Sequence, residues 1–153
     1  MLIKGNTPED VYKDLIEEIE ECGNEEIKEW LDDSKSELPP KVSLKMGWVK
    51  HAFVFCLRYL RLAQTEPELD ADYYVKWIKE VLKAGGDTDT NACIVGGMLG
   101  AMTGFEKLPE KPKTAVLNRK NNNGIKRDQF LLPSVYAEKL IDKLFELWPD
   151  EIL

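Results

Sequence analysis

The sequence has little histidine and cysteine, and it lacks long apolar runs. Among 153 residues there is one histidine, His51, and there are three cysteines, Cys22, Cys56 and Cys93, with no C-x-x-C pair. An odd number of cysteines leaves at least one thiol unpaired in any disulfide scheme. We therefore predict a protein of a reducing compartment, the cytoplasm or the nucleus.

Membranes and nucleic acids are not expected as partners. No stretch reaches the roughly 18 apolar residues of a membrane-spanning helix, and the N-terminus turns polar after three residues, unlike a signal peptide. Acidic residues outnumber basic ones by 28 to 21, giving a net charge of −7, so no overall positive field attracts a phosphate backbone. The charge is uneven, at −9 over residues 1–40 and +5 over residues 105–127.

What is present is a globular composition with helical periodicity. The chain is 43% hydrophobic and 32% charged, which with its length predicts one domain over residues 1–153. Apolar residues recur at spacings of three and four without period-two strands, so we predict a compact, orthogonal all-α domain. Helices are expected over residues 8–22, 25–35, 48–63 and 73–83, from near residue 88, and from about 134 to 148. Thr7 as a cap and Pro8 in the first position predict the start of the first helix, and Gly23 predicts its end. Residues 48–63 are apolar nearly all round, which predicts a mostly buried central helix. The Pro-, Lys- and Asn-rich segment 107–124 is expected to be a long surface loop.

One segment carries oxygen ligands close together. In Gly85-Gly86-Asp87-Thr88-Asp89-Thr90, the two glycines allow the backbone to approach a ligand closely, at the expected start of a helix. Asp87, Asp89 and Thr90 provide two carboxylates and a hydroxyl, which suit Mg²⁺ or Ca²⁺. The alternative to metal binding is that these residues only cap the helix, because Asp and Thr are common caps. The following glycines at 96, 97, 100 and 104 would let neighbouring helices pack closely.

This region resembles a known family. Residues 85–104, GGDTDTNACIVGGMLGAMTG, closely resemble the C-terminal signature of the ADP-ribosylglycohydrolase family. Residues 45–53, KMGWVKHAF, resemble the family's upstream Gly-aromatic-Val helix start, and the tail RDQFL at 127–131 resembles some protist and viral members. The resemblance spans about residues 8–148.

The resemblance implies a fold, a reaction and a set of site residues. The fold is that of the C-terminal half of the family's all-α domain, with two Mg²⁺ ions, or Mn²⁺, beside the ribose of ADP-ribose. The reaction is hydrolysis of the glycosidic bond of ADP-ribose adducts, and the catalytic residue is not identified. The metal ligands implied are Asp87, Asp89 and Thr90, and the substrate-binding residues implied are Gly85, Gly86, Gly47 and Trp48.

The family pattern is present only in part. Its early G-D motif and its T-D-D-T-type cluster do not occur before Gly85. We therefore expect only the C-terminal half of the metal site, with poor activity unless a complementing N-terminal-half chain or an oligomer supplies the rest. A split enzyme, a degenerate homologue and a fragment of a longer enzyme all fit. The alternative is a non-catalytic helical interaction or regulatory module.

Other polar and aromatic residues have two interpretations each. The lone His51 is expected to be packed in the core rather than to act as a general base. Trp48 either stacks on adenine or belongs to the core. Asp10 and Asp14 are expected to be solvated. The basic residues of the predicted loop would contact a pyrophosphate or simply be solvated: Lys111, Lys113, Arg119 and Lys120.

Overall fold

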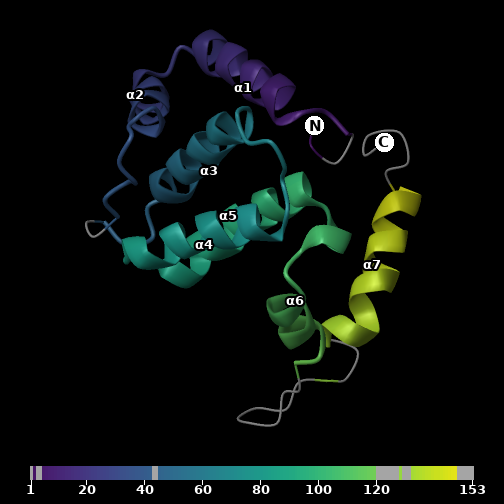
Figure 1. Ribbon diagram of the computed structural model, residues 1–153. Coiled ribbons are helices and arrows are strands. Elements are labelled where there is room, and N and C mark those ends of the chain that lie inside the picture. Colours follow the sequence, from purple (N-terminus) through teal and green to yellow (C-terminus); the bar gives the residue numbers. More distant parts are fainter. Residues whose placement is uncertain (1, 3–4, 43–44, 120–127, 129–131, 148–153) are drawn as a thin grey trace. The chain divides into compact units, whose positions relative to one another are not determined.

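The computed structural model confirms the all-α fold class. We describe the whole chain except residues 1, 3–4, 43–44, 120–127, 129–131 and 148–153. The described part holds seven α-helices, a 3₁₀ turn (η2) after α5, and no strand (Figure 1). The elements are α1 Pro8–Cys22, α2 Glu25–Ser34, α3 Lys50–Ala63, α4 Ala71–Ala84, α5 Thr88–Thr103, η2 Phe105–Lys107, α6 Glu110–Leu117 and α7 Pro133–Leu147.

The chain divides into two compact units, Met1–Leu108 and Pro109–Leu153. The first unit contains α1 to α5 and η2, and the second contains α6 and α7. The expectation of a single domain over residues 1–153 therefore stays a prediction. No helix of the described part is long and apolar enough to span a membrane.

Local side-chain chemistry sets the ends of α1. The Thr7 hydroxyl accepts a hydrogen bond from the Asp10 N–H at 3.2 Å, and the Asp10 carboxylate accepts one from the Thr7 N–H at 3.2 Å. This capping box satisfies two backbone donors, and hydrogen bonding to Thr7 lowers the pKa of Asp10. The expectation that Asp10 is merely solvated is wrong, because the residue caps the helix. Gly23, with φ of +66°, ends α1 as predicted.

Helix α3 is buried because other helices cover it on both sides. It packs against α1 and α2 on one side and against α5 on the other, and Figure 1 shows it between α1 and the α4/α5 pair. Leu57 and Leu60 belong to the cluster shared with α1 and α2, whereas Phe55 and Tyr59 belong to the cluster shared with α4 and α5. The nearly all-round apolar sequence of this segment is thereby explained.

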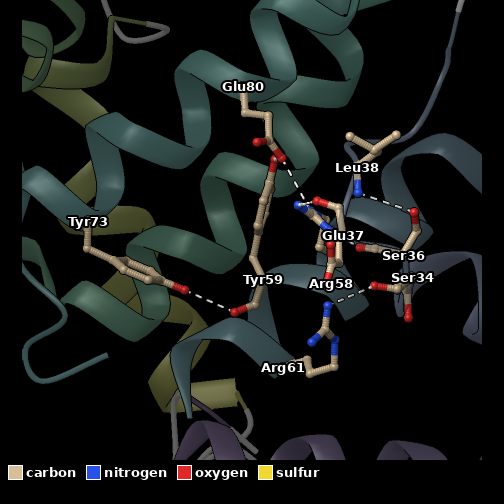
Figure 2. A network of polar contacts seen from close by, with 9 residues as sticks. All are labelled: Ser34, Ser36, Glu37, Leu38, Arg58, Tyr59, Arg61, Tyr73 and Glu80. Atoms are coloured by element: carbon tan, nitrogen blue, oxygen red, sulfur yellow. Dashed lines mark hydrogen bonds and ion pairs between the residues drawn. The ribbon is translucent and has the colours of Figure 1, made fainter. Parts of the chain in front are cut away.

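A buried arginine joins the α2–α3 connection, residues 35–49, to the helical core (Figure 2). The Arg58 side chain is 7% exposed, and its Nε lies 3.3 Å from Glu80 Oε1. Its Nη2 donates to the Glu37 carbonyl at 2.9 Å, and its Nη1 donates to the Ser36 carbonyl. The same Glu80 oxygen accepts from Tyr59 Oη at 3.1 Å. One guanidinium thus holds the connection to both α3 and α4.

Helices α4 and α5 make the most extensive contact of the first unit. A Cβ on Gly96 would lie 3.1 Å from Tyr74 Oη and 3.4 Å from Ile78 Cδ1, so the absence of a side chain allows this approach. The close packing predicted from the glycines is confirmed at Gly96. It is wrong for Gly97, which is exposed and has nothing within 4 Å of a Cβ position.

The second unit corrects the predicted loop at 107–124. Within it, α6 spans Glu110–Leu117. Pro112 is the third residue of α6, and a first-turn residue has no intrahelical N–H partner to lose. The Glu110 carboxylate accepts from Thr114 Oγ1 at 2.7 Å and pairs with Lys113 Nζ at 2.9 Å, which supports the short helix.

Helix α7 begins at Pro133, one residue before the predicted start. Its apolar side chains are between 37% and 66% exposed: Val135, Tyr136, Leu140, Ile141, Leu144, Phe145 and Leu147. Some predictions lie outside the described residues, namely those for Trp148, Lys120 and the RDQFL tail apart from Asp128.

Candidate functional site

A three-residue turn, residues 85–87, joins α4 to α5 and carries the predicted ligands. Gly85 and Gly86 have φ of +82° and +67°, which favour glycine. A Cβ on Gly86 would lie 2.5 Å from the Val42 carbonyl oxygen, closer than real contacts allow. What Gly86 approaches among the described residues is therefore the protein's own backbone, in the α2–α3 connection.

The two aspartates behave differently at the start of α5. Asp87 occupies the N-cap position, but its side chain makes no capping hydrogen bond. Hydrogen bonds from the Asp87 carboxyl and from the N–H groups of Asp89 and Thr90 lower the pKa of Asp89. Asp89 and Thr90 are exposed, and Asp87 is half-buried. The Asp87 carboxylate is therefore not engaged as a helix cap.

The turn lies beside the second motif of the sequence. Asp87 Oδ2 is 3.8 Å from the position that a Cβ on Gly47 would take. Gly47 is the third residue of a turn in which the Trp48 N–H donates to the Lys45 carbonyl at 3.0 Å. Two motifs 40 positions apart in the sequence thus meet, and three of the predicted site residues, Gly47, Gly86 and Asp87, lie at this junction.

A pocket of about 480 Å³ opens beside Trp48. The half-buried Trp48 ring has Lys45 Nζ 4.4 Å and Lys50 Nζ 5.1 Å from its centroid, and both lysines also line the pocket. Lys41 and His51 complete the basic part of the lining. Trp48 also packs edge-on against Trp30, with centroids 5.8 Å apart. The ring is therefore part of the packing and also borders a cation-rich pocket, which suits an anionic ligand with an aromatic group.

His51 is packed, as expected from its place in an apolar helix. The residue is 7% exposed, and its ring meets Trp48 edge-on at a centroid distance of 5.8 Å. The basic residues predicted on the loop belong to the second unit: Lys113 pairs with Glu110, and Lys111 and Arg119 are exposed.

Sequence reasoning missed the cations around Trp48. Lys41, Lys45 and Lys50 all lie within nine residues of the Gly-aromatic motif, and that spacing was an available signal. Their convergence on one pocket depends on the fold of the α2–α3 connection, in which Lys45 has an unusual φ of +55°.

The donor set at the turn is suited to a hard cation but is small. Asp87, Asp89 and Thr90 offer two carboxylates and one hydroxyl, the oxygen ligands that Mg²⁺ prefers, against about six positions on that ion. Across the part of the chain that the structure describes, no group of three or more His, Cys, Asp or Glu side chains is placed to hold a metal ion. By their chemistry alone, the three oxygen donors would account for about half of the positions on such an ion.

Comparison with known proteins agrees with the sequence resemblance. The family model described as ADP-ribosylglycohydrolase matches residues 1–150. No curated protein and no solved structure gives a significant match. The family match covers essentially the whole chain, and the described fold is all-α. This chain belongs to the ADP-ribosylglycohydrolase family.

Proposed function

We propose that this member of the ADP-ribosylglycohydrolase family supplies the C-terminal half of a Mg²⁺-dependent site for hydrolysing ADP-ribose adducts. Asp87, Asp89 and Thr90 would hold the metal, with Mn²⁺ as a substitute. Trp48 and the lysines beside it would bind the ADP-ribose. The family membership supports the class of ligand, and the donor atoms support the choice of metal.

One observation carries this proposal: the Asp87 carboxylate, unused by the helix cap, lies beside Gly47, whose neighbour in the sequence, Trp48, lines the pocket. A ligand with a ribose near the aspartates would have its anionic part close to Lys41, Lys45 and Lys50. Lys41 and Lys45 can neutralise a pyrophosphate, whereas the charge of Lys50 is balanced by Asp33, which lies 2.6 Å away in the same lining.

The chemistry is divided between metal and chain. When bound, Mg²⁺ orients ribose hydroxyls and polarises water for attack at the anomeric carbon. The Asp87–Asp89 pair positions the ion, Gly86 fixes the turn against Val42, and the lysines hold the anion. His51 is packed against Trp48 and is not assigned proton transfer.

The partial ligand set gives the first prediction. The purified chain with Mg²⁺ should release little or no ADP-ribose from an ADP-ribosylated protein or from O-acetyl-ADP-ribose, because about half of the metal shell would be water. Chromatography of released ADP-ribose measures this, with circular dichroism as the check on folding. Robust, EDTA-sensitive turnover by the chain alone would show that further ligands exist and that the half-site is wrong.

The second prediction tests the metal ligands directly. Titration with Mn²⁺ should broaden the amide NMR signals of residues 85–91 first, and D87N/D89N should weaken this binding at least about tenfold. The matched control is D70N/D72N, which has the same two-residue spacing at the start of α4 and keeps a capping side chain at position 70. Equal broadening in D87N/D89N and the wild type would refute ligation and leave capping as the role of the motif.

The alternative is a non-catalytic interaction module, and α5 offers an observation in its favour. The exposed side of α5 carries no charged side chain beyond the first turn: Cys93, Ile94, Gly97 and Ala101. Ile94 is 49% exposed, which suits contact with another protein. Metal binding separates the two functions, because an interaction module needs none.

A further inference from the structure

A second groove lies on the other flank of residues 38–42, against α4. It has a volume of about 660 Å³, within the range of sites that bind small molecules. Leu38, Pro39, Pro40 and Val42 form an apolar wall. We call this space the lysine groove, because the rest of its lining is dominated by Lys41, Lys76, Lys79 and Lys83.

The lining has a net positive charge in a chain whose net charge is −7. Lys41, Lys79 and Lys83 are exposed and form no ion pair with any described residue, whereas Lys76 pairs with Glu66 at 3.0 Å. The single acid of the lining, Glu80, is already neutralised by Arg58 and hydrogen-bonded by Tyr59. The groove thus holds unpaired cations beside an apolar wall.

The wall of the groove is held in place before any ligand arrives. Arg58 binds the carbonyls of Ser36 and Glu37 directly before the wall, and two consecutive prolines restrict its backbone. At the other end, Gly86 is pressed against the Val42 carbonyl. A preformed groove loses less conformational entropy on binding than a mobile one.

We propose that the lysine groove binds a diphosphate-bearing ligand of the nucleoside diphosphate class. Lys79 and Lys83 lie one helical turn apart, with Cβ atoms about 5–6 Å from each other, a spacing that lets both ammonium groups reach adjacent phosphates. Lysine is a common point-charge ligand for phosphate. The base of the nucleotide lies on the wall formed by Pro39 and Pro40. This site does not use the Asp87–Asp89 pair, and it shares Lys41 and the wall residues Leu38, Pro39 and Pro40 with the pocket of Trp48.

The experiment titrates the full chain in EDTA with pyrophosphate, ADP and adenosine, followed by amide NMR shifts. Pyrophosphate and ADP should shift signals of residues 38–42 and 76–84, and the affinity should fall as salt is raised. K79E/K83E should weaken ADP binding at least about tenfold. The matched control is K139E/K143E, the same charge change at the same spacing on exposed residues of α7. D87N/D89N should bind ADP like the wild type.

Three results would overturn the proposal. The first is ADP binding that is unchanged in K79E/K83E. The second is a set of shifts confined to the surroundings of Trp48, which would place the ligand in the other pocket. The third is a groove that responds to a glutamate-rich peptide and to neither pyrophosphate nor ADP, which would make it a protein-docking surface. If K79E/K83E does not fold, K79Q/K83Q serves in its place.

Discussion

Replacing Arg58 by methionine should lower the free energy of unfolding by about 3–5 kcal/mol, the range for breaking a buried ion pair from one side. The Arg58 side chain is 7% exposed, and its partner Glu80 is 23% exposed. Methionine fills much of the volume but leaves the Glu80 carboxylate without its cation. It also leaves the Ser36 and Glu37 carbonyls without their donors.

Chemical denaturation followed by circular dichroism measures this effect. Lys35→Met is the control, because its ion pair with Asp32 has side chains 51% and 75% exposed and should contribute at most about 1 kcal/mol. The double variant R58M/E80Q should recover part of the loss, since no unpaired carboxylate remains. An R58M variant as stable as K35M would show that the network of Figure 2 contributes little.

The sequence was sufficient to predict those features of the fold that depend on residues close together along the chain. Thr7 and Pro8 predicted the start of α1, and Gly23 predicted its end, because capping involves residues within one turn. The nearly all-round apolar character of residues 48–63 likewise predicted a mostly buried central helix, and α3 is one. The loop predicted at 107–124 from its Pro-, Lys- and Asn-rich composition is wrong over residues 110–117, because Pro112 stands in the first turn of α6, where proline is tolerated.

Contacts between distant segments could not be predicted in this way. The sequence did not predict that Arg58 is buried and paired, because its partners are 21 and 22 positions away and leave no periodic signal. The motif at 85–90 predicted the oxygen donors of the candidate site. Its position beside Gly47 depends on the path of the α2–α3 connection, which the Arg58 network and the Gly86–Val42 contact hold in place.

Gly86→Ala should lower the free energy of unfolding by about 2–5 kcal/mol. The left-handed backbone at φ of +67° costs an L-residue about 1–2 kcal/mol. The new Cβ would also lie 2.5 Å from the Val42 carbonyl oxygen, and since this is backbone rather than a flexible side chain, the turn or the connection must move. Overpacking of this kind costs about 1–3 kcal/mol more.

Comparison of Gly86→Ala with Gly23→Ala separates the steric part of that loss from the backbone part. Gly23 has nearly the same φ, +66°, but nothing lies within 4 Å of its Cβ position, so only the backbone cost of about 1–2 kcal/mol applies. Denaturation of the two variants side by side should therefore show Gly86→Ala to be the less stable by about 1–3 kcal/mol. Gly86→Ala should also displace Asp87 from Gly47 and weaken the Mn²⁺-dependent broadening, which Gly23→Ala should leave unchanged. Equal stability of the two variants would mean that the turn does not press on Val42 in solution, and the junction that joins the two motifs would lose its structural basis.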